Sequence, residues 1–79
     1  MKITKEQLLA SISKVVALKD YTSEDTLFSA KYGLQSSDWV YIVKQLAMDY
    51  NFTITDDFID AMGGATFADL ELLVEKHSR

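Results

Sequence analysis

The clearest helical pattern in the chain lies in residues 36–51, which read SSDWVYIVKQLAMDYN. At about 100° per residue, one stripe of this segment is apolar throughout, and it consists of Trp39, Ile42, Val43, Leu46 and Tyr50. The serine pair and Asp38 are typical of a helix start, because a hydroxyl caps the first turn and the helix dipole favours an acid there. The segment therefore predicts an amphipathic helix that begins at Ser36 and ends near Asn51.

Two apolar side chains of this helix fall outside the stripe. Tyr41 and Met48 are seven residues apart, two turns along one face, and they point almost directly away from the apolar stripe. Lys44 lies between them. Single exposed apolar residues are common and need no function, but an aromatic ring and a flexible thioether also suit a docking patch. Both interpretations stay open at this point.

The segments before this helix predict one further helix and a long connection. Thr4 and Gln7 form a capping box ahead of apolar residues at helical spacing, which predicts a helix from Lys5 to about Leu18. The connection 19–35 is long for a structureless loop in so small a domain. We expect it to hold a short helical turn near residues 25–31 or to be functional. Four apolar residues should pin it to the core: Leu27, Phe28, Tyr32 and Leu34.

The segments after residue 51 predict two more helices. Thr55 begins a short helix that continues to Met62, and the Gly63-Gly64 pair supplies the left-handed conformation that ends it. Thr66 then serves as the N-cap of the last helix, with an acid at the N3 position. No segment alternates as a strand does. We therefore expect one domain over residues 1–79, an all-α four-helix bundle with a long loop between helices one and two and a short third helix.

Composition restricts the classes of function. Of the 79 residues, 48% are hydrophobic and 25% charged, which is ordinary for a folded globular domain. Without cysteine the chain has no disulfide or thiolate metal site, and neither a signal peptide nor a membrane span fits its short apolar runs, so we expect a cytoplasmic protein. Residues 38–75 hold 8 acids and the single base Lys44. That half repels a phosphate backbone, which makes nucleic acid a poor partner and a basic protein surface a better one.

Little in the sequence supports catalysis. The single histidine, His77, is the third residue from the end of the chain, and we interpret it as a surface residue. Asp56 and Asp57 are adjacent acids in a first helical turn, where surface charges that complement the dipole are common. No glycine-rich phosphate loop is present. We therefore expect no enzymatic activity and no metal site.

The segment from Gly33 to Asp38 is the remaining candidate site. Ser36 is predicted to be exposed at the N-terminus of a helix, where unpaired N–H groups and the positive end of the dipole favour a phosphate ester. Taken alone, the segment favours a simple cap, because serine is a preferred N-cap residue.

The order of elements over nearly all 79 residues resembles the acyl carrier protein and peptidyl carrier protein family. In that family a Gly-x-Asp-Ser-Leu motif opens the second helix, and Gly33-Leu34-Gln35-Ser36-Ser37 stands at that place without a gap. Other residues similar to the family's are Phe28, Asp38, Val40, Leu46, Tyr50, Ile54 and Thr66. The resemblance implies 4′-phosphopantetheine attached to Ser36, which carries an acyl or aminoacyl group as a thioester.

The resemblance also implies partners. They are a phosphopantetheinyl transferase and the loading and synthase enzymes of a fatty-acid, polyketide, nonribosomal-peptide or related pathway. We expect the carrier itself to be a monomer. We expect these partners to contact Gln35, Ser37, Asp38, Tyr41, Lys44 and Met48. Gln35 replaces the family's usual aspartate and Ser37 its usual leucine, and the helix is less acidic than in fatty-acid carriers. These departures indicate a dedicated carrier with its own partners, or a carrier fold that has lost its arm.

Two other hypotheses remain. The chain could be an unmodified helical interaction module, in which Tyr41 and Met48 dock a partner and Ser36 is only a cap. A third option is protein phosphorylation at Ser36 or Ser37.

Overall fold

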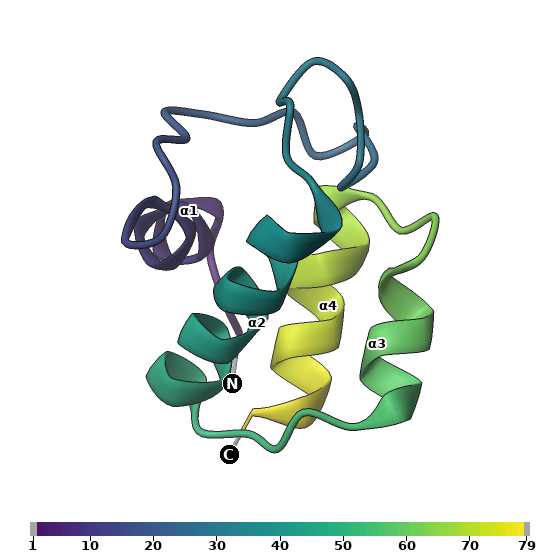
Figure 1. The fold of residues 1–79 in the computed structure, drawn as a ribbon. Helices are drawn as coiled ribbons and strands as arrows, with labels where there is room; N and C mark the ends of the chain where they lie inside the picture. Colours follow the sequence, from purple (N-terminus) through teal and green to yellow (C-terminus); the bar gives the residue numbers. More distant parts are fainter. Residues whose placement is uncertain (1, 79) are drawn as a thin grey trace.

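The computed structural model describes residues 2–78, and within them it contains helices but no strand. The helices are α1 (Lys5–Ser13), α2 (Ser36–Tyr50), α3 (Asp56–Met62) and α4 (Phe67–His77). In Figure 1, α2 crosses between α1 and α4, and α3 flanks α4 on the side away from α1. The expected all-α bundle, with a long first loop and a short third helix, is confirmed.

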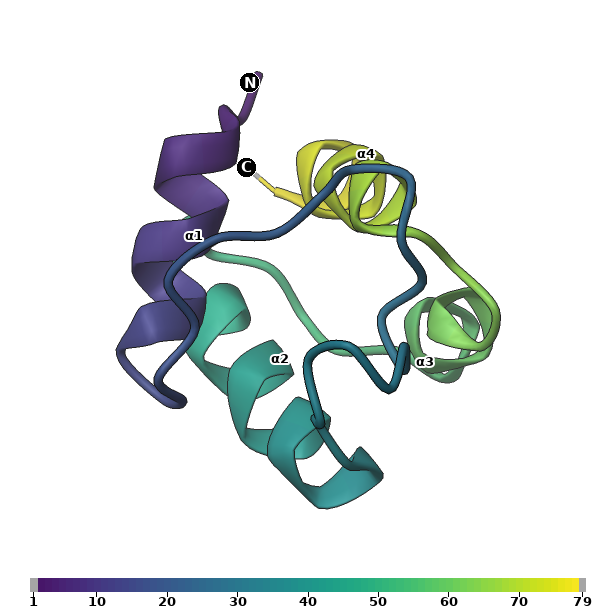
Figure 2. The same cartoon turned by 90° about the horizontal axis from the view of Figure 1, so that it is seen from above.

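The core forms where the apolar faces of the helices meet. Seen from above, the helices stand around a common centre, and the long loop runs around it from α1 across α4 and past α3 to α2 (Figure 2). The predicted stripe of α2 faces this centre, since Trp39, Ile42, Val43 and Leu46 are all buried. Fully buried side chains from the other elements complete the core: Leu8, Ile12, Leu27, Phe58, Phe67, Leu70 and Val74.

Two of the predicted helix starts are confirmed in atomic detail. Thr4 Oγ1 accepts from the Gln7 N–H at 3.2 Å, while Gln7 Oε1 accepts from the Thr4 N–H at 3.0 Å. The same reciprocal pair joins Thr66 and Asp69 at the start of α4, at 3.1 and 3.2 Å. Each capping box satisfies two N–H groups that have no acceptor within the helix.

α1 is shorter than predicted, because it ends at Ser13 rather than near Leu18. The Val15 and Val16 N–H groups both reach the Ile12 carbonyl, which tightens the last turn, and the Ser13 hydroxyl donates to the Leu18 carbonyl at 2.8 Å. β-branched valines are weak helix formers. The two valines pack against the core from this turn instead of from a helix.

The long loop does not contain the short helical turn that was one of the two alternatives for residues 25–31, and it is ordered by hydrogen-bonded turns and tertiary hydrogen bonds. Three separate hydrogen-bonded turns cover residues 22–32. Both peptide groups of Leu27 are used: its N–H donates to Ala65 O at 3.0 Å, and its carbonyl accepts from the Trp39 indole N–H at 3.1 Å. Because this backbone joins α2 to the α3–α4 junction, we call residues 25–27 the strut.

Phe28 holds the loop only in part, since 44% of its surface is exposed while its ring lies 6.2 Å from that of the buried Trp39, between centroids. Leu27 is fully buried, and Tyr32 and Leu34 are partly buried against the core. In the strut, Thr26 and Thr66 form an isolated antiparallel bridge.

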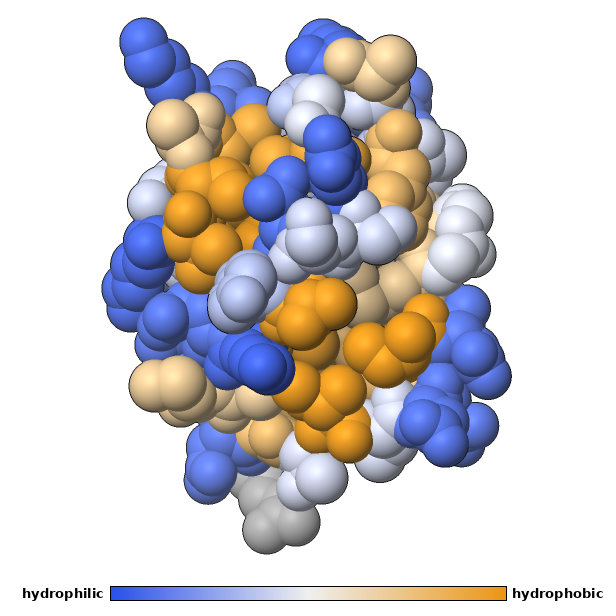
Figure 3. Space-filling view, viewed as in Figure 1, coloured by the Kyte–Doolittle hydropathy of each residue, from blue (hydrophilic) through white to orange (hydrophobic). Residues whose placement is uncertain are grey.

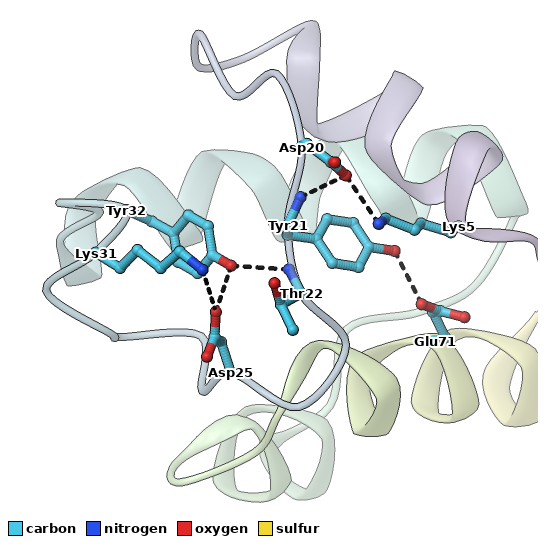
Figure 4. Close-up of polar contacts among 8 residues, drawn as sticks. All are labelled: Lys5, Asp20, Tyr21, Thr22, Asp25, Lys31, Tyr32 and Glu71. Carbon is cyan, nitrogen blue, oxygen red and sulfur yellow. Dashed lines mark hydrogen bonds and ion pairs between the residues drawn. The ribbon is translucent and has the colours of Figure 1, made fainter.

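Polar contacts fasten the loop at two further places (Figure 4). Asp20 pairs with Lys5 of α1 at 2.8 Å, and the Tyr21 hydroxyl donates to Glu71 of α4 at 2.9 Å. Burial and the Glu71 carboxylate raise the pKa of Tyr21, so this hydroxyl stays protonated. The loop is therefore tied to α1, α2 and α4.

A second polar cluster closes the loop on itself (Figure 4). Asp25 accepts hydrogen bonds from the Tyr32 hydroxyl at 2.6 Å and from Lys31 Nζ at 3.2 Å. The Tyr32 hydroxyl bond, followed by the Lys31 ammonium, lowers the pKa of Asp25. The folded loop therefore holds this carboxylate in its charged form.

One prediction about α4 was wrong. His77 is a half-buried residue of α4 rather than a surface residue, with its ring edge-on to Phe58 at 5.3 Å between centroids. The Gly63-Gly64 pair ends α3 as predicted, since Gly64, the residue after the C-cap Gly63, has the left-handed conformation (φ +76°). None of the helices in residues 2–78 is long and apolar enough to cross a membrane.

Candidate attachment site

Ser36 is the first residue of α2, and its side chain is exposed. The chain approaches it through Gly33, whose φ of +64° is a left-handed conformation that glycine adopts without strain. Gln35 then returns to an extended conformation, with φ −103° and ψ 169°. This turn places the serine hydroxyl at the open end of a helix of 15 residues.

The expected hydroxyl cap of α2 is not formed. The N-cap residue is Gln35, and the Asp38 carboxylate reaches back to accept from the Gln35 N–H at 2.9 Å. This bond is one of the two in a capping box, namely the one in which the side chain at N3 accepts from the N–H of the N-cap residue. Within residues 2–78, neither Ser36 nor Ser37 uses its side-chain oxygen in a hydrogen bond. The Ser36 hydroxyl is consequently free for chemistry without loss of a cap.

An apolar groove of about 230 Å³ opens beside Ser36, between α2 and α3. Its floor is made of buried side chains and its rim of exposed ones. The floor residues are Trp39, Val43 and Met62, and the rim residues are Phe28, Ser36, Val40, Ile59 and Gly63. In Figure 3, viewed as in Figure 1, apolar residues gather between α2 and α3 on this face. The attachment candidate is thus the one hydroxyl on the rim of this groove.

The other side of Ser36 carries the predicted partner residues. Tyr41 is 62% exposed and Met48 is 76% exposed, which confirms that both point to solvent. At about 100° per residue, Ser37, Tyr41, Lys44 and Met48 share one face of α2. Lys44 Nζ lies 5.6 Å from the centre of the Tyr41 ring, within cation–π range. We call these residues the outward stripe.

The predicted site residues therefore divide between two places. Ser37, Tyr41, Lys44 and Met48 lie together in the outward stripe, whereas Gln35 and Asp38 form the cap at the start of α2. Ser36 lies between the stripe and the groove.

The groove itself was not foreseen. Val40 is one turn beyond Ser36 on the same face, so its 52% exposure could have been inferred from the helical spacing. Ile59 follows Phe58 directly, and because Phe58 and Met62 are buried, Ile59 must face away from the core. That these residues converge on Ser36 depends on how α3 packs, which no local pattern encodes.

The site contains no catalytic constellation among the described residues. The Asp38 carboxylate is engaged by Gln35, and His77 packs on Phe58 rather than near Ser36. No group of three potential metal ligands occurs in residues 2–78. Within residues 2–78, therefore, no histidine or unengaged carboxylate stands beside the Ser36 hydroxyl to act as its base.

The comparisons with known proteins add no relative: no family model matches the chain, and neither the curated proteins nor the solved structures contain a significant match.

Proposed function

We propose that this chain is a carrier protein, in which Ser36 bears 4′-phosphopantetheine and presents a thioester-bound acyl group to partner enzymes. The observation that carries the proposal is the position of Ser36: its hydroxyl is exposed and uncommitted at the start of α2, on the rim of an apolar groove. Carriers need an accessible hydroxyl more than an active site, and the absence of a neighbouring base among the described residues fits that role.

The residues around Ser36 fit a phosphopantetheine group. The N–H groups of Ser36 and Ser37 have no acceptor within α2, and with the positive end of the helix dipole they favour a phosphodiester there. The Asp38 carboxylate in the first turn already accepts a hydrogen bond from the Gln35 N–H. This bond offsets part of the repulsion between that carboxylate and a phosphate. The thiol of the group supplies the thioester chemistry, and the domain supplies its position.

The attachment step requires a phosphopantetheinyl transferase and coenzyme A. The Ser36 oxygen forms a bond to the phosphorus on the pantetheine side of the pyrophosphate. The P–O bond to the second phosphate breaks, adenosine 3′,5′-bisphosphate leaves, and the serine proton passes to a base of the transferase. Ser36 is favoured over Ser37 because it lies on the groove, whereas Ser37 heads the outward stripe.

Intact mass after coexpression with a broad-specificity transferase tests the proposal. We expect the parent chain to gain the mass of one phosphopantetheine group and Ser36→Ala to gain none. Ser36→Ala should keep its melting temperature within about 2 °C, because Gln35 and Asp38 form the cap. Ser37→Ala is the matched control, and it should be modified at least as well as the parent. An unmodified parent, or a modified Ser36→Ala variant, would reject the assignment.

A second variant tests recognition by a standard transferase. Ser37→Leu places an apolar side chain at the exposed head of the outward stripe, beside the attachment serine. We expect it to be modified faster than the parent under matched conditions, since binding of the transferase gains apolar contact area. Equal or slower rates would show that residue 37 does not limit recognition.

The exposed side chains of Tyr41 and Met48 support a second candidate, an unmodified interaction module. In that case Ser36 stays unmodified in every coexpression, and alanine substitutions at Tyr41 and Met48 still abolish binding to a partner. Intact mass therefore separates the two functions.

A further inference from the structure

The outward face of α4 carries an apolar side chain that the core does not use. Leu72 lies two positions from the buried Leu70 and Val74, so at about 100° per residue it points away from them, and 62% of its surface is exposed. An open groove of about 440 Å³ lies beside it, between α3 and α4. We call this groove the α4 groove, and it is lined by Ala61, Gly63, Gly64, Ala65, Asp69, Leu72, Leu73 and Lys76.

Two opposite charges stand on the same face. Asp69 and Lys76 are exposed, both line the α4 groove, and their spacing of seven residues places them about 10 Å apart along one side of the helix. Lys76 is the only lysine or arginine in residues 45–78, and it takes no part in the ion pairs of residues 2–78. The two charges cancel, in a chain whose net charge is −4. A second copy of the chain is therefore repelled less at this face than at the acidic surface of α3.

The spacing of these residues is self-complementary. In an antiparallel pair of α4 helices related by a two-fold axis, Asp69 of each copy faces Lys76 of the other, and Leu72 faces Leu73, because both pairs have the same midpoint along the helix. A uniformly basic partner is attracted at Asp69 but repelled at Lys76, and a uniformly acidic partner meets the opposite conflict. A second copy of this chain matches both charges at once.

The α4 groove also leaves room for a close approach. Its wall on the side of α3 is made of Ala61, Gly63 and Gly64, which contribute a methyl group or no side chain at all. A β-carbon at Gly64 would meet no atom within 4 Å, so this position is open toward the surface. The exposed Leu72 of a second copy therefore finds both free space and an apolar neighbour, the half-buried Leu73.

We propose that the outward face of α4 is the interface of a symmetric homodimer, in which Asp69 pairs with Lys76 and Leu72 packs on Leu73 of the other copy. The inference goes beyond the proposed carrier function, does not depend on it, and departs from the monomer that the family resemblance implies. In Figure 2, α2 and α4 lie on opposite sides of the common centre, so the dimer leaves Ser36 of both copies exposed. One face of an 11-residue helix is small for a stable interface, so we expect a transient dimer with a Kd on the order of 0.1 mM.

Sedimentation velocity of the full chain, at concentrations up to about 1 mM, tests the dimer. The two copies of position 72 lie next to the two-fold axis, so Leu72→Lys and Leu72→Glu should each stay monomeric, because each brings two like charges together. An equimolar mixture of the two variants should recover the dimer, since a lysine of one chain then meets a glutamate of the other. Both variants should keep the circular dichroism of the parent, because position 72 is exposed. A parent that stays monomeric at about 1 mM overturns the proposal and leaves this face to a different partner.

A charge reversal tests the pairing at the ends of the face. Lys76→Glu should weaken the dimer at least about tenfold, because the two-fold symmetry replaces two attractive pairs by two repulsive ones. Lys44→Glu is the matched control, since it makes the same change in net charge at an exposed lysine of α2, and its Kd should stay within about threefold of the parent's. Equal weakening by both variants would show that net charge alone is responsible, and it would overturn the pairing.

A change of shape tests the α4 groove without a change of charge. Gly64→Asn keeps a residue that tolerates the left-handed conformation, and its side chain extends into the open space of the groove. We expect it to weaken the dimer at least about tenfold. Gly33→Asn is the matched control, because Gly33 is also left-handed (φ +64°), has no atom within 4 Å of a β-carbon and lies outside the α4 groove. A dimer that persists in Gly64→Asn, Lys76→Glu and Leu72→Lys uses another surface and overturns the proposal.

Discussion

Replacement of the tryptophan that supports the long loop gives the sharpest test of the fold around Ser36. The Trp39 indole N–H donates to the Leu27 carbonyl at 3.1 Å in the buried interior, and Trp39→Phe removes this donor. An unpaired buried acceptor costs about 1–3 kcal/mol. The smaller ring also leaves roughly 40 Å³ empty, which adds about 1 kcal/mol at about 24 cal/mol per Å³. We therefore expect a loss of about 2–4 kcal/mol in the free energy of unfolding.

Urea titration followed by far-ultraviolet circular dichroism measures this loss without relying on tryptophan fluorescence. A domain of 79 residues has a total stability of about 4–12 kcal/mol, so the variant should still fold, with a melting temperature lower by about 8 °C or more. Hydrogen exchange at the Leu27 amide should accelerate, because its bond to Ala65 belongs to the same strut. Tyr41→Phe, at an exposed position of the same helix, should change stability by less than about 0.5 kcal/mol. A Trp39→Phe loss as small as that control would refute the strut as the support of the site.

Two further predictions concern the outward stripe and the loop. Tyr41→Ala combined with Met48→Ala should leave the melting temperature nearly unchanged, since both side chains are exposed. The double variant should also weaken acyl transfer to the cognate partner about tenfold, which corresponds to about 1.4 kcal/mol. A melting temperature lower by several degrees would instead place both side chains in the core. Asp25 has a pKa below its usual range because of Tyr32 and Lys31, so its contribution to stability is present above about pH 4 and is lost as pH falls through the folded-state pKa. Thermal melts from about pH 7 to about pH 3 should therefore show Asp25→Asn less stable than the parent at neutral pH and converging with it in acid; a constant difference across that range would contradict the linkage.

Local patterns were sufficient to predict the presence and order of the helices, though not the end of α1, because each helix start and apolar face is enforced by a strong local rule. The spacing of Trp39, Ile42, Val43 and Leu46 left one buried face, and the structure buries those four. The capping boxes at Thr4 and Thr66 needed only residues three positions apart.

Predictions failed where tertiary contacts decided the outcome. The cap of α2 is an exception, because a local contact decided it: several neighbouring polar residues could serve as the cap, and the bond from the Gln35 N–H to the Asp38 carboxylate selected Gln35. His77 lies near the end of the chain, where a surface position is usual, but α4 extends to it and its ring packs on Phe58. The strut could not be anticipated either, because the partners of Leu27 are 12 and 38 residues away. The groove depends on the strut and on the packing of α3, and it was missed for the same reason.

The two sides of Ser36 present different charges, and this difference constrains how a partner can approach. Asp56, Asp57 and Asp60 are all exposed on α3, beyond the groove, so that side attracts a basic surface. The outward stripe instead carries Lys44 over the Tyr41 ring, and a basic surface is repelled there. Under the proposed function, we expect a partner that reaches Ser36 to place its basic residues over α3 and its apolar residues over the stripe. We expect the reverse orientation to be disfavoured, because it opposes like charges, and Lys44→Glu should weaken that preference by making both sides acidic.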